Sequence, residues 1–195
     1  IIACLVGSEM CIRDRLMSPE KKVLLPDMKA GCSLSSSITG DDVRNLKKQY
    51  PGVPVVSYVN TSADVKAETD VCCTSANAVK IVESLGVKKV IFLPDDFLAK
   101  YVASQTDIEI ISWKGTCEVH EQFNDQEIND IRKANPGIKI IAHPECPPDV
   151  IQASDFAGST SGMIKYVRDN QPKKVMMVTE LSLIHISEPT RQAMI

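Results

Sequence analysis

Residues able to do chemistry recur at matched positions in this sequence. Cys32 and Cys117 are 85 residues apart (117 − 32). Tyr58 and His143 keep the same offset. Thiolates bind soft metals and iron–sulfur clusters, whereas imidazole, phenol and carboxylate groups move protons or bind harder ions. Such residues at one fixed offset indicate equivalent sites in two copies of a repeated domain.

The offset also holds at positions with no reactive side chain. An internal period of this length is that of a domain, because solenoid repeats usually run about 20 to 50 residues. The matching segments are Tyr50-Pro-Gly-Val53 with Asn135-Pro-Gly-Ile138, Lys88-Lys-Val90 with Lys173-Lys-Val175, Asp64-Val65 with Asp149-Val150, Asp70 with Asp155 and Ser75 with Thr160.

Apolar, β-branched runs alternate with amphipathic segments within each copy. Such strands predict a parallel sheet covered by helices on both faces. We therefore expect an α/β fold of pseudo-symmetric, three-layer domains with parallel four-stranded sheets, incomplete in this chain. The predicted strands are 53–59, 71–74, 88–93 and 108–113, and the predicted helices are 41–49, 62–68, 76–85 and 97–104.

The domain organisation follows from the offset. Residues 22–25 match 108–110, so 16–31 are expected to end a first α/β domain. A second domain is expected at 32–116 and a third, truncated, at 117–180. The two terminal segments, 1–15 and 181–195, can be encoded by opposite strands of one DNA segment over 5–15 and 181–191. We interpret both as non-native, adapter-derived sequence.

Composition narrows the class of partner. The chain has 22 basic and 25 acidic residues, a net charge of −3 and no apolar run of about 20 residues. We therefore expect neither a nucleic acid nor a membrane as partner, and a cytoplasmic location. The odd count of 7 cysteines favours thiols or metal ligands over disulfides.

Polar residues follow the predicted strands at the edge where parallel α/β sheets bind ligands. Several readings stay open from the residues alone. Cys32 and Cys117 could be ordinary buried thiols. Ser75 and Thr160, ahead of repeated helices, could bind an anion or simply cap those helices. Tyr58 could simply pack, His120 could cap a helix or face solvent, and Glu145 could be an exposed loop charge.

The motifs, in their order and spacing, resemble quinolinate synthases over residues 16–180. They are Leu24-Leu-Pro-Asp27, Ala30-Gly-Cys-Ser-Leu34, Tyr58-Val-Asn-Thr-Ser-Ala63, Cys73-Thr-Ser-Ala-Asn77, Trp113-Lys-Gly-Thr-Cys-Glu-Val-His120, His143-Pro-Glu145 and Gly158-Ser-Thr-Ser161. The resemblance implies three domains around a [4Fe-4S] cluster held by three cysteines, with Cys32 and Cys117 as two of them. The third is expected about 85 residues after Cys117, beyond Glu180.

The resemblance also implies a reaction, with the open iron of the cluster as Lewis acid. Iminoaspartate and dihydroxyacetone phosphate would condense to quinolinate, phosphate and water in NAD biosynthesis, and the enzyme that oxidises aspartate could supply the iminoaspartate. The catalytic residues would be Tyr58, His143 and Glu145. The substrate-binding residues would be Tyr58, Asn60, Ser75, His120, His143, Glu145 and Thr160. The alternative is a cluster-less remnant that binds small anions.

Overall fold

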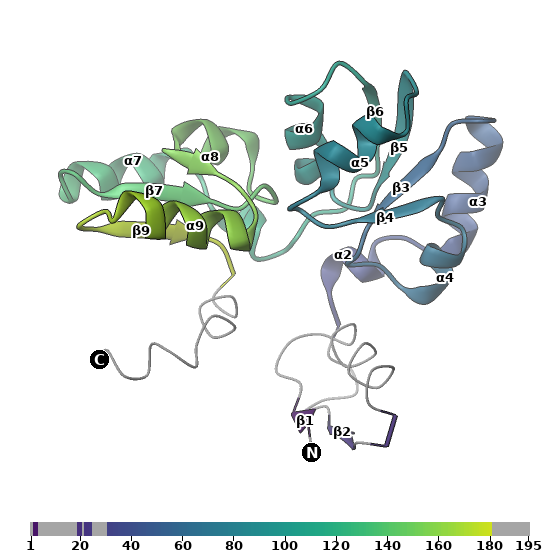
Figure 1. Ribbon diagram of the computed structural model, residues 1–195, viewed down its shortest axis with the longest axis horizontal. Coiled ribbons are helices and arrows are strands. Elements are labelled where there is room, and N and C mark those ends of the chain that lie inside the picture. Colours follow the sequence, from purple (N-terminus) through teal and green to yellow (C-terminus); the bar gives the residue numbers. More distant parts are fainter. Residues whose placement is uncertain (1, 4–18, 21, 25–30, 181–195) are drawn as a thin grey trace.

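The computed structural model describes residues 2–3, 19–20, 22–24 and 31–180, and most of the described chain forms two α/β units (Figure 1). The first unit contains α2 (Ser33–Ser36), α3 (Gly40–Gln49), β3 (Val55–Tyr58), α4 (Ala63–Ala67), β4 (Val71–Cys73), α5 (Ala78–Ser84), β5 (Lys89–Leu93), α6 (Asp96–Ala103) and β6 (Glu109–Ser112). The second contains η1 (His120–Gln122), α7 (Asp125–Ala134), β7 (Lys139–Ala142), α8 (Pro148–Ala153), β8 (Phe156–Ala157), α9 (Thr160–Asn170) and β9 (Val175–Val178).

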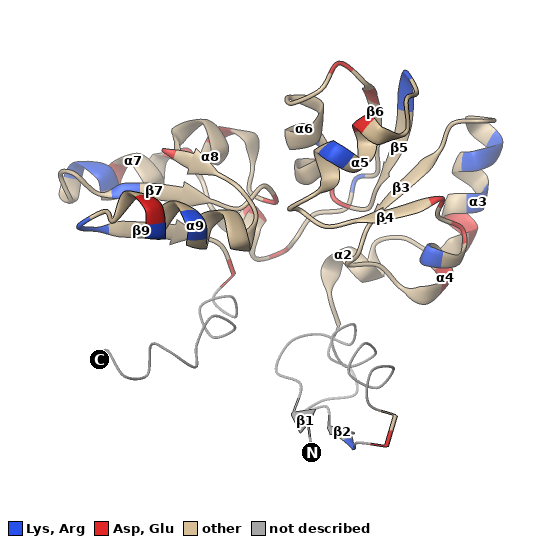
Figure 2. Cartoon of the chain, viewed as in Figure 1, with Lys and Arg blue, Asp and Glu red and all other residues tan. Residues whose placement is uncertain are grey.

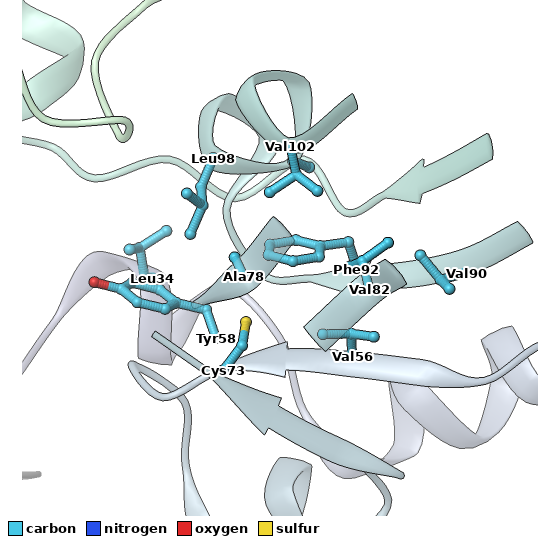
Figure 3. Close-up of a cluster of buried hydrophobic side chains, with 11 residues drawn as sticks. Leu34, Val56, Tyr58, Cys73, Ala78, Val82, Val90, Phe92, Leu98 and Val102 are labelled. Carbon is cyan, nitrogen blue, oxygen red and sulfur yellow. The ribbon is translucent and has the colours of Figure 1, made fainter. Parts of the chain in front are cut away.

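The first unit is a parallel four-stranded sheet in the order β4-β3-β5-β6, with helices on both faces. Side chains alternate along β3, so Val56 and Tyr58 enter one core cluster while Val55 enters another. Residues of α5 and α6 complete the cluster of Val56, part of which Figure 3 shows. Residues of α3 and α4 complete the other. The expected three-layer α/β arrangement is confirmed.

The second unit repeats the first in strand order and register. Its parallel sheet has the order β8-β7-β9, in which β7 stands where β3 stands in the first unit. Val55 pairs with Ile91 and Ile140 pairs with Met176, so both partners move by the same 85 residues that separate Cys32 from Cys117. The predicted repeat is therefore a repeat of structure.

Two local features recur with the sheet. The carboxylate of Asp70 accepts a hydrogen bond from the Val55 amide at 2.7 Å, and Asp155 accepts from the Ile140 amide at 2.9 Å. Gly52 and Gly137 both adopt a positive φ, 77° and 81°, which favours glycine after a helix. In each unit, the glycine and the aspartate together fix how the preceding helix connects to the first strand of the sheet.

The predicted elements are present, with bounds shorter by one or two residues at most ends, as is usual where caps interrupt a periodic pattern. Of the predicted strand 22–25, β2 (Val23–Leu24) is described, and it pairs in parallel with β1 (Ile2–Ala3). Apart from Ile2–Ala3, the segments interpreted as adapter-derived lie outside the described residues. That interpretation and the domain boundaries stay predictions.

Charged residues of both signs recur along several helices of the two units (Figure 2). Figure 2 shows Lys and Arg on α3, α7 and α9, with acidic residues interspersed among them. Within the described residues, no helix is long and apolar enough to cross a membrane. The side chains predicted to be reactive lie at the carboxyl ends of the strands.

Candidate active site

Reactive side chains from both units meet at the carboxyl ends of their first strands. Tyr58 is the last residue of β3, and His143 directly follows β7. Glu145 lies two residues further, in a tight loop where the Cys146 amide bonds the His143 carbonyl at 2.9 Å. Parallel strands end at one edge of a sheet, so the repeated fold places these loops at equivalent edges.

A buried hydrogen bond joins the two units. The Tyr58 hydroxyl donates to Oε1 of Glu145 at 2.7 Å. The Tyr58 ring lies in the core with its hydroxyl at the rim (Figure 3), and Glu145 is only 4% exposed. Burial raises the pKa of Glu145 to about 7, and it raises the pKa of Tyr58 well above 10, with help from Glu145. Glu145 can thus gain or lose a proton near neutral pH.

Two histidines flank this carboxylate. The rings of His120 and His143 stack with centroids 5.2 Å apart, and Nδ1 of each lies 3.5 Å from a Glu145 oxygen. Burial lowers the pKa of His120 to about 4 and that of His143 to about 3, the latter also through His120. Both rings are therefore neutral at pH 7, and these contacts are not salt bridges.

The hydrogen bonds assign a tautomer to His143. Its Nδ1 accepts from the Glu145 amide at 3.4 Å, so the ring proton belongs on Nε2, which lies 3.2 Å from the Ser75 hydroxyl. His120 bonds Thr179 through Nε2 at 3.2 Å, while its Nδ1 is buried with no hydrogen-bond partner in the described chain. An orphaned ring nitrogen in a site of this kind points to a ligand.

Ser33, the residue after Cys32, connects the segment of Cys32 to the segment of Cys117. Cys32 is the N-cap of α2, and the Ser33 hydroxyl donates to the Thr116 carbonyl and accepts from the Glu118 amide, each at 3.1 Å. These bonds hold the backbone on both sides of Cys117. Both cysteines pack against the same core cluster. Burial raises the pKa of Cys117 to about 12, so without a metal it is a thiol.

Cys32 and Cys117 could supply two of the thiolate ligands of the predicted cluster. Thiolates are the ordinary ligands of iron–sulfur clusters. The Cys117 thiol also lies against the Glu145 carboxylate, within the group formed by Cys117, His120 and Glu145. The third cysteine, which the resemblance places beyond residue 180, stays a prediction. The donor set therefore fits the part of the cluster site that this chain can supply.

Ser75 and Thr160 do not cap the helices that they precede. Asn77 is the N-cap of α5, and Ser159 caps α9 by accepting from the Gly162 amide at 3.2 Å. Thr160 is instead the first residue of α9, and Ser75 bonds His143. Capping, the alternative left open by the sequence, is thus wrong for both. The substrate-binding roles of Asn60, Ser75 and Thr160 stay predictions.

The sequence analysis missed Asp95. This residue lies two positions after the end of β5 and is fully buried. Its Oδ1 accepts from the Leu98 amide at 2.8 Å, whereas Oδ2 has no hydrogen-bond partner in the described residues. Burial, with Glu145 second, raises its pKa to about 8, so it is largely protonated at pH 7. Its place at the end of a predicted strand was the signal that could have identified it.

Comparison with known proteins gives a consistent result. A family model described as Quinolinate synthetase A protein matches residues 1–193. The chain is 62% identical over 174 residues to a quinolinate synthase of Sinorhizobium fredii, covering 89% of the chain and 48% of the relative. It is 58% identical over 169 residues to quinolinate synthase 2 of Mesorhizobium japonicum, covering 87% and 52%. The chain thus spans about half the length of the curated relatives it matches.

Proposed function

The chain belongs to the quinolinate synthase family, and from this premise we propose that the complete protein condenses iminoaspartate with dihydroxyacetone phosphate. The products would be quinolinate, phosphate and water, in the biosynthesis of NAD. We also propose that the protein works in the cytoplasm and receives iminoaspartate from the enzyme that oxidises aspartate. The observation that carries the proposal is the buried contact of Tyr58 with Glu145 between two neutral histidines.

Glu145 suits the proton transfers that this condensation requires. Forming the ring moves protons away from carbon and onto departing oxygen atoms, which calls for a group that titrates near the working pH. The pKa of Glu145, about 7, meets that need. Tyr58 keeps the carboxylate in place through the 2.7 Å bond and offers a second proton to the same position.

His143 and Ser75 suit the binding of substrate oxygen atoms. Because Nδ1 of His143 accepts from the Glu145 amide, Nε2–H is a fixed donor that can pass from Ser75 to a substrate oxygen without a change of charge. Thr160 opens α9, an 11-residue helix whose first amide groups favour a phosphate or carboxylate. The chain's residues would thus orient an anionic substrate and protect it from water.

Cys32 and Cys117 would hold a [4Fe-4S] cluster together with a third cysteine from the rest of the protein. Bound in this way, the cluster would supply a Lewis acid that assists the loss of hydroxyl groups. Without the third cysteine, the 195-residue chain alone is expected to make no quinolinate.

Substitutions in the complete protein test this proposal after anaerobic cluster reconstitution. Cys32→Ala is expected to abolish both the cluster absorption and quinolinate formation, because it removes one of three protein ligands. His143→Ala is expected to keep the cluster and slow turnover by about 10²- to 10⁴-fold, the range typical of acid–base groups. Cys72→Ala is the matched control, since Cys72 is exposed.

Each outcome has an opposite that decides against the proposal. Full activity in Cys32→Ala with an intact cluster would refute the assignment of the ligands. A wild-type protein that takes up no cluster on reconstitution, binds small anions and makes no quinolinate would favour the cluster-less remnant instead.

A further inference from the structure

Three buried donor atoms of different chemistry lie together at the junction of the two units. Cys117, His120 and Glu145 each offer one ligand atom, and these atoms all lie within 4.8 Å of one another. His120 and Glu145 are 3% and 4% exposed. Nδ1 of His120, the atom that faces Glu145 at 3.5 Å, has no hydrogen-bond partner in the described chain. A buried nitrogen without a partner costs stability unless something occupies the space before it.

The spacing of these donors suits a tetrahedral ion. Zinc binds imidazole nitrogen and carboxylate oxygen at about 2.0 to 2.2 Å, which sets two such donors about 3.4 Å apart. The observed 3.5 Å between Nδ1 of His120 and Oε2 of Glu145 matches that separation. The Cys117 sulfur lies within 4.8 Å of a donor atom of each of the other two residues. The set of three then leaves one position open, as in catalytic zinc sites.

Neighbouring residues orient two of these three ligands through hydrogen bonds. Nε2 of His120 bonds the Thr179 hydroxyl at 3.2 Å, which directs Nδ1 into the site. The Tyr58 hydroxyl holds Oε1 of Glu145 and leaves Oε2 to face His120. Charge also favours an ion here, because a thiolate, a carboxylate and a divalent cation sum to zero, and a neutral assembly is the least costly to bury.

We propose that Cys117, His120 and Glu145 form a mononuclear site for a divalent, zinc-like ion in the protein that lacks its cluster. The mixed sulfur, nitrogen and oxygen donors select zinc or cobalt over magnesium and calcium, which prefer oxygen alone. Cys32 takes no part in this site. The ion would occupy one proposed cluster ligand and two proposed substrate-binding residues, so it would exclude cluster and substrate together.

Cobalt titration of the 195-residue chain tests this site, under anaerobic and reducing conditions, with Co²⁺ as the spectroscopic probe. Tetrahedral cobalt gives visible ligand-field bands, and a bound thiolate adds a charge-transfer band in the near ultraviolet. We expect both bands at one Co²⁺ per chain and their loss when Zn²⁺ is added. Cys117→Ser should remove the charge-transfer band. His120→Ala should weaken binding by at least about tenfold, the lower range for changes at metal sites.

Two controls separate this site from the proposed cluster. Cys32→Ser should keep both bands and the same midpoint, whereas it would remove a ligand of the cluster. Cys146→Ala, at a buried cysteine whose thiol bonds the Val178 carbonyl, should also leave the bands unchanged. Circular dichroism establishes that each variant is folded.

Several results would overturn the proposal. A charge-transfer band that survives in Cys117→Ser, or that disappears in Cys32→Ser, would place the ion on other ligands. Octahedral cobalt spectra, or Mg²⁺ competing as well as Zn²⁺, would show that the donor set is wrong. None of these results bears on whether the complete protein makes quinolinate, because no measurement requires the cluster or the substrates.

Discussion

Burial of Asp95 makes folding depend on pH in a direction that can be worked out. Its pKa is about 8 in the folded protein, raised mainly by burial, against an ordinary value of 3.8. Between these values the folded protein holds a proton that the unfolded chain has lost, so stability falls as the pH rises. The slope is about 1.4 kcal/mol per pH unit, which amounts to about 3 kcal/mol between about pH 5.5 and about pH 7.5.

Asp95→Asn removes this dependence with little change of shape. The amide oxygen can still accept from the Leu98 amide, the bond that caps α6, but the group no longer titrates. We expect the variant to gain about 3 kcal/mol over the wild type as the pH rises across that interval. Glu145 also titrates near pH 7 and faces Asp95, but it is present in both proteins, so the difference between them isolates Asp95.

Urea denaturation of the 195-residue chain at both pH values measures this difference. Fluorescence of Trp113, the chain's 1 tryptophan, reports on the unit that contains Asp95. Asp96→Asn is the matched control: although burial opposes it, bonds with Lys100 and Ser112 lower the pKa of Asp96, so this group stays ionised in the folded and the unfolded chain across the interval and should add no pH dependence. Parallel pH profiles for the wild type and Asp95→Asn would refute the reasoning, because Asp95 would then not be a protonated buried acid.

Two further predictions concern the segment that carries Cys117. Ser33→Ala should destabilise the chain by about 1 to 3 kcal/mol and shorten the lifetime of a reconstituted cluster in the complete protein, because the Thr116 carbonyl and the Glu118 amide lose their partner. Ser36→Ala, at an exposed serine, is the control. Equal melting temperatures for the two variants would contradict this prediction. Gly115→Ala should destabilise by about 1 to 3 kcal/mol, since the new Cβ would lie 2.6 Å from the Pro94 carbonyl oxygen; a melting temperature equal to that of the wild type would exclude the clash.

The sequence predicted the fold well because the same local pattern of apolar and polar residues occurs twice along the chain. Apolar runs predicted the strands, and matched positions such as Asp70 and Asp155 predicted their equivalence. Both carboxylates do bond the first strand of their own sheet. Helix starts were predicted less well. Asn77, and not Ser75, occupies the N-cap position of α5 without a side-chain cap bond, and Ser159, and not Thr160, caps α9. One or two residues of offset along a helix decide which hydroxyl reaches the open amide groups.

Family resemblance predicted Tyr58, His143 and Glu145 as catalytic residues, and the sequence itself indicated that Tyr58 and His143 are equivalent in the repeat. Tertiary structure decided which of them touch. Tyr58 and His143 occupy matched positions, yet Tyr58 bonds Glu145, 87 residues away, and His143 bonds Ser75, 68 residues away. An offset states that two positions are alike within their own domains, but it carries no information on how one domain packs against the other. Burial raises the pKa of Glu145, and burial together with the charge of Glu145 raises the pKa of Asp95.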